Sequence, residues 1–225
     1  VSIEKSAAID FLIEEDGILC SNDAFGQHIC LSERFDYEVD EAILMASAQK
    51  FYANLITPSS GLYLLKMKEL GDLDLVSKVK MIAPSHGQIR TEQAKIIGKY
   101  NEWASGECKD KVTLVYDTMH HSTTKMAQAM AEGIMSAGFE VKMYYLHEDD
   151  RSDLVTDILD SKAVCIGSPT VMNNPYPSLG DTIYYLTALN FAATTYKKQA
   201  VIFGSKGWGG GATNKLETDL TAAGC

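Results

Sequence analysis

The chain has 225 residues, of which 46% are hydrophobic and 22% are charged. These values are typical of a globular chain that folds in water, and the length suffices for one or two domains. Acidic residues outnumber basic residues by 30 to 20, so the formal net charge is −10. An excess of negative charge argues against non-specific binding to nucleic acid, which needs a positive surface.

We expect neither a signal peptide nor a transmembrane segment, because the sequence shows no apolar run of that kind. Its five cysteines are scattered and include no CxxC pair. This usage argues against a disulfide scaffold or a zinc ribbon and favours the reducing cytoplasm. We expect both ends to be truncated, because residue 1 is not Met and the last residues stop where a further strand is expected.

Residues 1–105 are predicted to form one domain that begins with a β-hairpin. Two short apolar runs, at 9–13 and 17–20, flank an Asp-Gly pair that favours a tight turn. A helix with Leu44, Ala48, Phe51 and Leu55 on its apolar face is expected to end at Pro58. The remaining predicted elements are a helix over 61–70, a strand over 79–83 and a closing helix that contains Ile96, Ile97, Tyr100 and Trp103.

A polar segment at 104–111 is the best candidate for a domain boundary, and residues 110–225 are predicted to form a second domain. Strands are predicted at 112–116, 140–145, 163–167 and 199–203. Helices are predicted between them at 122–137, 152–160, 178–188 and 211–223. Repeated strand–helix units of this length predict an α/β fold, a doubly wound parallel sheet with right-handed crossovers.

A hydroxyl-rich loop joins the first predicted strand of this domain to its helix. The loop comprises Thr118, Met119, His120, His121, Ser122 and Thr123. Hydroxyl groups and unpaired amides at a helix N-terminus favour a bound anion such as a phosphate. The alternative is an ordinary capped helix, although capping needs only one such residue. The two histidines are open to a second interpretation, as exposed loop residues whose amides matter more than their rings.

Two further loops follow predicted strands of the same sheet. The second contains Ser168, Pro169, Thr170, Val171, Met172, Asn173 and Asn174, and the third contains Gly204, Ser205, Lys206, Gly207, Trp208, Gly209 and Gly210. Ligands of open α/β sheets bind beyond the carboxyl ends of the strands, where these loops lie. Small residues let the backbone approach a flat ring, and Trp208 could stack on such a ring. A glycine-rich turn without a ligand remains the alternative for the third loop alone.

Asp23 and His86 stand out in the first domain. Each lies just beyond a predicted strand, in the segments Ser21–Gly26 and Pro84–Gly87. Taken singly, each is open to a structural interpretation, as a turn aspartate or a hydrogen-bonded loop histidine.

The three loops resemble those that bind FMN in flavodoxins, and the whole chain after about residue 9 resembles flavodiiron proteins. The second resemblance rests on Leu19–Gly26 and Ala83–Gly87, followed by the flavodoxin-like half. It implies the C-terminal part of a metallo-β-lactamase-like αββα domain, joined to a flavodoxin-like domain that lacks its last strand. The segments Phe51–Pro58, Tyr116–His120 and Leu146–Ser152 are most similar to the methanogen branch of the family, which oxidises the reduced deazaflavin coenzyme F(420).

The resemblance implies FMN as a cofactor and Asp23 and His86 as ligands of a pair of iron ions in the intact protein. The family's other iron ligands come from an upstream His-x-Glu-x-Asp motif and a further histidine, none of which occurs here. Two donors cannot hold a diiron centre, so we expect this polypeptide by itself to bind little or no iron.

The resemblance further implies an enzyme that reduces dioxygen to water with electrons from the deazaflavin, passed through FMN. A homodimer or higher homo-oligomer is implied, in which the FMN of one subunit faces the irons of another. One alternative is a nitric oxide reductase of the same architecture with rubredoxin as donor. Two others remain open from the residues: a plain FMN electron-transfer module, and a metallo-hydrolase that uses the first half only.

Overall fold

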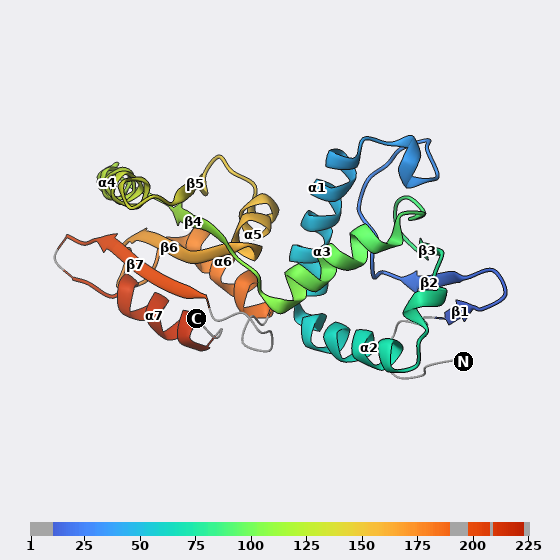
Figure 1. Cartoon of the computed structure of the whole chain (residues 1–225). Coiled ribbons are helices and arrows are strands. Elements are labelled where there is room, and N and C mark those ends of the chain that lie inside the picture. The colour runs from blue at the N-terminus through green and yellow to red at the C-terminus, as the bar shows by residue number, and fades with distance from the viewer. Residues whose placement is uncertain (1–10, 190–197, 208, 223–225) are drawn as a thin grey trace. The chain divides into compact units, whose positions relative to one another are not determined.

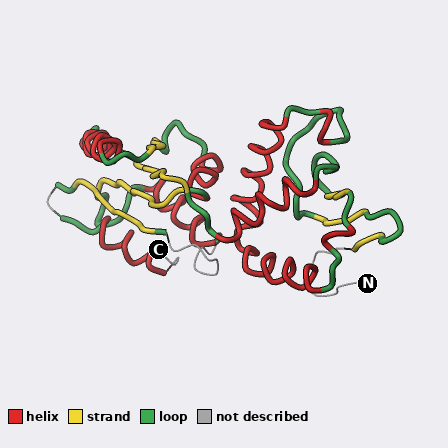
Figure 2. Tube along the Cα trace, viewed as in Figure 1, coloured by secondary structure: helices red, strands yellow, loops and turns green. Residues whose placement is uncertain are grey.

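In the computed structural model, residues 11–189, 198–207 and 209–222 are described (Figures 1 and 2). The chain divides into two compact units, Val1–Ser105 and Gly106–Cys225. No helix in the described part of the chain has both the length and the apolar character needed to cross a lipid bilayer.

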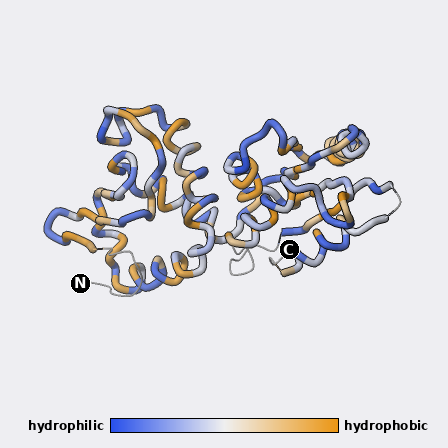
Figure 3. Tube along the Cα trace, turned by 180° about the vertical axis from the view of Figure 1, so that it is seen from behind, coloured by the Kyte–Doolittle hydropathy of each residue, from blue (hydrophilic) through white to orange (hydrophobic). Residues whose placement is uncertain are grey.

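The first unit contains a three-stranded sheet in the order β1-β2-β3. β1 (Phe11–Ile13) pairs antiparallel with β2 (Ile18–Asn22), which pairs in parallel with β3 (Met81–Pro84). The predicted hairpin is confirmed within the described residues, and its turn is polar (Figure 3). Gly17 has a φ of +71°, and a Cβ there would lie 2.7 Å from the carbonyl oxygen of Lys78. The turn therefore requires glycine at this position.

Helices of the first unit follow one another almost without a break. α1 (Glu41–Phe51) is capped by the Asp40 carboxylate, which accepts from the amide of Ala42 at 2.9 Å. A π-helical turn (Tyr52–Ile56) and a 3-10 turn (Thr57–Ser59) lead directly into α2 (Ser60–Asp72). The expectation that the helical path ends at Pro58 is wrong, because proline lies in the first turn of a new segment, where its missing N–H costs nothing. The π-turn also shifts the helical register, so Leu55 is 50% exposed rather than buried.

The closing helix α3 (Gln93–Ser105) brings aromatic side chains into the core of the first unit, as predicted. The rings of Tyr52 and Tyr100 are fully buried, with centroids 4.8 Å apart and planes nearly perpendicular. Burial raises the pKa of Tyr52 to about 12, although its hydroxyl forms a hydrogen bond with Ser60. Short 3-10 turns at Asp36–Glu38 and Val76–Lys78 complete the unit.

The second unit contains a four-stranded sheet in the order β5-β4-β6-β7, and every pair of neighbours is parallel. Its strands are β4 (Lys109–Tyr116), β5 (Glu140–Tyr145), β6 (Ser161–Pro169) and β7 (Gln199–Ser205). The chain places β5 on one side of β4 and then β6 and β7 on the other side, so the topological switch point lies between β4 and β6. The predicted doubly wound parallel sheet is thus confirmed, with β4 and β6 longer than expected.

Helices cover both faces of this sheet (Figure 1). α4 (Ser122–Ser136) contacts all four strands on one face. α6 (Pro177–Ala188) and α7 (Ala212–Ala222) contact each other on the opposite face, and α5 (Arg151–Leu159) contacts β4 and β6.

The buried face of α4 is lined by small side chains rather than by its larger apolar ones. The buried residues are Thr123, Ala127 and Ala131, whereas Met126 is 38% exposed. Small side chains let the helix backbone approach the sheet closely, and the longer Met130 and Ile134 pack along the flank of the core.

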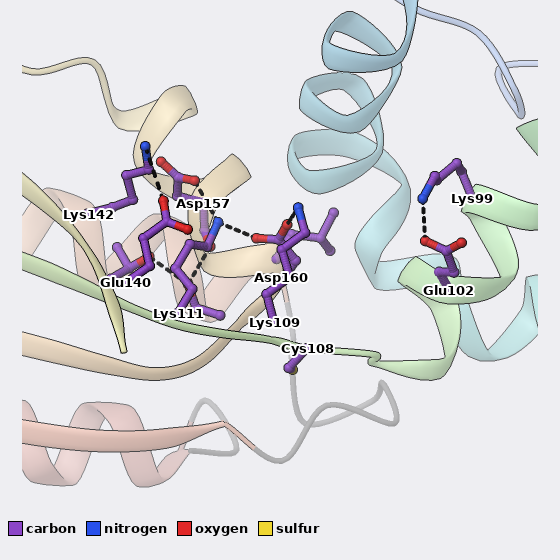
Figure 4. A network of polar contacts seen from close by, with 12 residues as sticks. Lys99, Glu102, Cys108, Lys109, Lys111, Glu140, Lys142, Asp157 and Asp160 are labelled. Carbon is purple, nitrogen blue, oxygen red and sulfur yellow. Dashed lines mark hydrogen bonds and ion pairs between the residues drawn. The ribbon is translucent and has the colours of Figure 1, made fainter. Parts of the chain in front are cut away.

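A buried ion-pair network stabilises the beginning of β4 (Figure 4). The Lys111 ammonium, 5% exposed, lies 2.7 Å from Asp157 and also contacts Asp160. Burial acts to lower the pKa of Lys111, but hydrogen bonds to both carboxylates outweigh it, and the pKa is raised. For Asp160, burial acts to raise the pKa, but Lys109 and Lys111 lower it overall.

Replacing Asp160 with asparagine should destabilise the second unit, because Lys111 and Lys109 lose a buried partner. We expect the free energy of unfolding in urea at pH 7 to fall by about 2–4 kcal/mol. The lowered pKa of Asp160 means that its contribution is complete above the unfolded carboxyl value of about 4 and is lost as the pH falls through the folded value. The free energy of unfolding of the variant should therefore fall less steeply than that of the parent protein as the pH is lowered through this range.

Lys162→Met is the matched control, since it breaks an ion pair with Asp110 whose side chains are 50% and 72% exposed. Its effect should stay below about 1 kcal/mol. Equal effects of the two substitutions would contradict a stabilising role for the buried network.

Candidate functional site

The three loops predicted to bind a ligand meet at the carboxyl edge of the second unit's sheet. The Ser205 hydroxyl, at the end of β7, lies 3.2 Å from the Ser122 hydroxyl and 3.3 Å from the Thr123 hydroxyl. The amide of Thr170, just after β6, donates to the Ser205 carbonyl at 2.8 Å. Ser205 therefore joins the first loop to the third, and the third to the second.

The first loop presents hydrogen-bond donors that no group in the described part of the chain uses. The Thr118 side chain is 7% exposed, and its Oγ1 has no hydrogen-bond partner among the described residues. His121, the N-cap of α4, has a φ of +58° and no side-chain hydrogen bond to the amides that follow it. The first turn of α4 thus offers unpaired backbone N–H groups beside the buried Thr118 hydroxyl. This combination suits an anion at the helix N-terminus.

The second loop turns sharply beyond β6. Val171 and Asn174 exchange two backbone hydrogen bonds of 2.9 Å, and the two residues between them have positive φ. Met172, at the tip, is 90% exposed. The Ser168 hydroxyl is buried and accepts from the amide of Tyr176 at 2.9 Å, which fixes the return of the loop to α6.

Glycines let the third loop approach the second. A Cβ at Gly211 would lie 2.3 Å from the Asn173 carbonyl oxygen, and a Cβ at Gly209 would lie 2.9 Å from the Asn173 side-chain oxygen. A Cβ at Gly204 would lie 2.1 Å from the Ser168 carbonyl oxygen. Larger residues at these positions would force the loops apart.

The predicted ligand-binding residues differ widely in exposure. Four are buried: Thr118, Thr123, Ser168 and Pro169. Five are half-buried: Thr170, Val171, Gly204, Ser205 and Gly209. The exposed ones are Met119, His120, His121, Ser122, Met172, Asn173, Asn174, Lys206, Gly207 and Gly210. Trp208 lies outside the described residues.

Asp117 is a residue of this site that the sequence did not single out. Its carboxylate is 3% exposed, accepts from the Thr118 amide at 2.7 Å and accepts from the Ser178 hydroxyl of α6. Its own amide donates to the Gly167 carbonyl at 3.2 Å. The sequence feature that could have identified Asp117 is its position directly after a buried strand. Asp117 holds the first loop against β6 and α6.

In the first unit, the structure brings Asp23 and His86 together. β2 and β3 are parallel, so the loops after them lie at the same edge of the sheet. The His86 Nε2 lies 3.1 Å from an Asp23 carboxylate oxygen, and both side chains are about half exposed. The Ser85 hydroxyl lies 3.3 Å from the same carboxylate oxygen. The His28 ring is 5.4 Å from the His86 ring.

The loop that carries Asp23 is held in a constrained conformation. Phe25 has a φ of +66°, which is unusual for a bulky residue, and its amide donates to the buried Tyr100 hydroxyl at 2.7 Å. A Cβ at Gly26 would lie 2.9 Å from the His86 carbonyl oxygen, so this glycine lets the two loops interlock. Tyr100 therefore positions the Asp23 loop, a role that its place in the closing helix did not reveal.

Known proteins are similar to this chain over nearly its whole length. Residues 114–225 match the flavodoxin family model. The coenzyme F(420)H(2) oxidase of Methanothermobacter thermautotrophicus is 56% identical over 95% of this chain and 53% of its own length. The nitric oxide reductase of Moorella thermoacetica is 43% identical over 94% of this chain and 52% of its own length. The chain thus spans about half the length of the curated relatives it matches.

Solved structures agree with the observed fold. Rubredoxin oxygen:oxidoreductase from Desulfovibrio gigas superposes with a TM-score of 0.89 at 32% identity, over 96% of this chain and 53% of its own. The flavodiiron protein of Giardia intestinalis gives 0.87 at 26% identity, over 99% of this chain and 57% of its own.

The chain belongs to the flavodiiron protein family. Its first unit is accordingly the C-terminal part of a metallo-β-lactamase-like domain, and its second unit is flavodoxin-like, as the sequence predicted. In this flavodiiron chain, no group of three or more His, Cys, Asp or Glu side chains gathers around a possible metal ion among the described residues. Asp23 and His86 place one carboxylate and one imidazole side by side at this edge of the first unit's sheet.

Gly204→Ala tests the close approach of β7 to β6, because the new methyl group would collide with the Ser168 carbonyl. We expect the free energy of unfolding to fall by about 1–3 kcal/mol. Gly207→Ala in the same loop is the matched control, since a Cβ there meets no atom of the described residues within 4 Å. It should change stability by less than about 0.5 kcal/mol. Urea denaturation measures both, and equal stability of the two variants would contradict the described packing.

Proposed function

We propose that the second unit binds FMN, with the phosphate at the first loop and the ring beside the second and third loops. The single observation that carries this proposal is the unpartnered, buried Thr118 hydroxyl beside the uncapped N-terminus of α4. A buried donor without a partner costs about 1–3 kcal/mol, a cost that a phosphate oxygen would remove. The flavodoxin match over residues 114–225 supports the same cofactor.

Different residues of the chain would bind the phosphate and the ring of FMN. The hydroxyl groups of Thr118, Ser122 and Thr123 and the first amides of α4 would receive the phosphate. The loops at Ser168–Asn174 and Gly204–Gly210 would enclose the ring, with Trp208 as a further candidate. A bound flavin accepts an electron pair as hydride and releases electrons singly.

Thr118→Val tests the phosphate site, because it should weaken FMN binding without lowering the stability of the FMN-free protein. The substitution removes a buried hydroxyl that has no partner, so the protein without FMN should be as stable as before or more stable. Binding of FMN should weaken about tenfold, because one hydrogen bond to a charged group is lost. Quenching of flavin fluorescence measures the affinity, and urea denaturation of the FMN-free protein measures the stability.

Thr156→Val is the matched control. Its hydroxyl donates to the Ser152 carbonyl within α5, away from the three loops. FMN affinity should remain unchanged in this variant. An unchanged affinity in Thr118→Val as well would refute the assignment of the phosphate site.

For the full gene product, we propose a water-forming oxidase that takes electrons from the reduced deazaflavin coenzyme F(420) and passes them through FMN to dioxygen. The 56% identity to the methanogen oxidase supports this activity and donor. We further propose a homodimer or higher homo-oligomer in the cytoplasm. The scattered cysteines support the reducing compartment.

Asp23 and His86 are proposed as ligands of the oxidase's diiron site. Oxygen and nitrogen donors suit iron, and a bridging carboxylate suits a metal pair. Because two donors do not complete such a site, the rest must come from sequence other than the described residues. An in-frame His-x-Glu-x-Asp segment in the gene upstream of Val1 would supply them.

In the full gene product, Asp23→Ala and His86→Ala should each lower the iron content and reduce dioxygen consumption more than about 100-fold. Loss of one ligand leaves the metal pair without its coordination geometry. Lys66→Met, which breaks an exposed pair with Glu69 on α2, is the control and should retain both iron and turnover. Full iron content with unchanged turnover in either ligand variant would refute the assignment.

Nitric oxide reduction with rubredoxin as donor is the second candidate function, supported by the 43% identity to a nitric oxide reductase. Turnover of dioxygen and of nitric oxide, each measured with reduced deazaflavin and with reduced rubredoxin, separates the two. Faster nitric oxide turnover with rubredoxin would favour the second candidate.

A further inference from the structure

Cys108 and Lys198 lie together at the amino edge of the second unit's sheet, away from the three loops. Cys108 immediately precedes β4 and Lys198 immediately precedes β7. The Lys198 Nζ is 3.3 Å from the Cys108 sulfur, although the residues are 90 positions apart in sequence. Figure 4 shows Cys108 at the beginning of β4, next to the Lys111 network. None of the functions proposed above uses this pair.

The surroundings of Lys198 direct its amine toward the sulfur. Its Nζ donates to the carbonyl oxygens of Leu159 at 2.9 Å and Ser161 at 2.6 Å, and these oxygens can only accept. The same Nζ also donates to the Cys108 sulfur, so these contacts hold the nitrogen 3.3 Å from the thiol.

The charge state of Lys198 favours reactivity. The side chain is 5% exposed, and burial lowers its pKa, although Cys108 and Asp160 act in the opposite direction. Lys111 contributes a further lowering. More of the amine is therefore neutral near physiological pH than in an exposed lysine. A neutral amine is the form that can attack an electrophilic sulfur.

Cys108 is accessible to a small oxidant. The residue is half-buried, and its thiol donates to the Gly106 carbonyl at 3.2 Å. Among the described cysteines, Cys30 is exposed and Cys165 is buried, and burial raises the pKa of the Cys165 thiol to about 11. Cys108 thus combines access to solvent with a neighbouring amine.

We propose that Cys108 and Lys198 form a reversible sulfur–nitrogen cross-link when the protein meets hydrogen peroxide. Peroxide first oxidises the thiol to a sulfenic acid and is itself reduced to water. The Lys198 amine then attacks the sulfur, the S–N bond forms, and the sulfenic hydroxyl leaves with an amine hydrogen as a second water. The protein loses two hydrogen atoms in all. A small thiol reverses the link by taking the sulfur into a mixed disulfide and releasing the amine.

The cross-link would tie together the beginnings of β4 and β7, which are separated by β6 in the sheet. Joining residues 90 positions apart restricts the unfolded chain strongly, so the oxidised protein should unfold at a higher temperature. The same reaction would protect Cys108 from irreversible oxidation to the sulfinic acid.

Peptide mapping by mass spectrometry of the 225-residue protein, before and after peroxide, tests the proposal. We expect a peptide pair joined through Cys108 and Lys198 that lacks two hydrogens and separates on addition of a thiol. Its yield should rise with pH as more of the amine becomes neutral. The unfolding temperature should rise on oxidation and return on thiol treatment.

Two variants make the test specific. Lys198→Arg keeps the positive charge and N–H donors but removes the primary amine, and Cys108→Ser removes the sulfur; neither should form the link or gain stability on oxidation. Cys30 is the internal control for general oxidation, because it is exposed. Recovery of Cys108 as free thiol or as sulfinic acid, with Lys198 unmodified while Cys30 is oxidised, would overturn the proposal.

Discussion

Parallel pairing of the strands is the constraint on which both candidate sites depend. In the second unit, all four strands point their carboxyl ends to one edge, so three loops far apart in sequence meet there. In the first unit, the parallel pairing of β2 with β3 does the same for Asp23 and His86. Each site therefore follows from hydrogen bonding between strands rather than from proximity in the chain.

Buried polar groups then give the second unit's site its chemical character. Asp117 uses both carboxylate oxygens on neighbouring donors and holds the first loop in place. Thr118, next to it, has a buried hydroxyl with no partner in the described parts of the chain. Because the Asp117 carboxylate already has its hydrogen-bond partners, the neighbouring Thr118 hydroxyl is the group that can donate to a bound anion such as a phosphate.

Much of this arrangement could be predicted from the sequence, because short apolar strands alternate with helices at regular intervals. The strand at 140–145 was predicted with its observed bounds. The meeting of the loops follows from the general rule for parallel sheets. The predicted roles of the individual loop residues stay predictions, as do the iron-binding roles of Asp23 and His86. Other features depend on packing that no local pattern records: the π-turn at Tyr52–Ile56, the alanine face of α4, and the contacts of Asp117 and Tyr100.

The most direct test of the central claim compares FMN with riboflavin, which lacks the phosphate, in equilibrium titrations of the flavin-free protein. If the helix N-terminus and the Thr118 hydroxyl receive a phosphate, FMN should bind at least about 100-fold more tightly, since several hydrogen bonds to a charged group are at stake. Equal affinity for the two flavins would contradict the account.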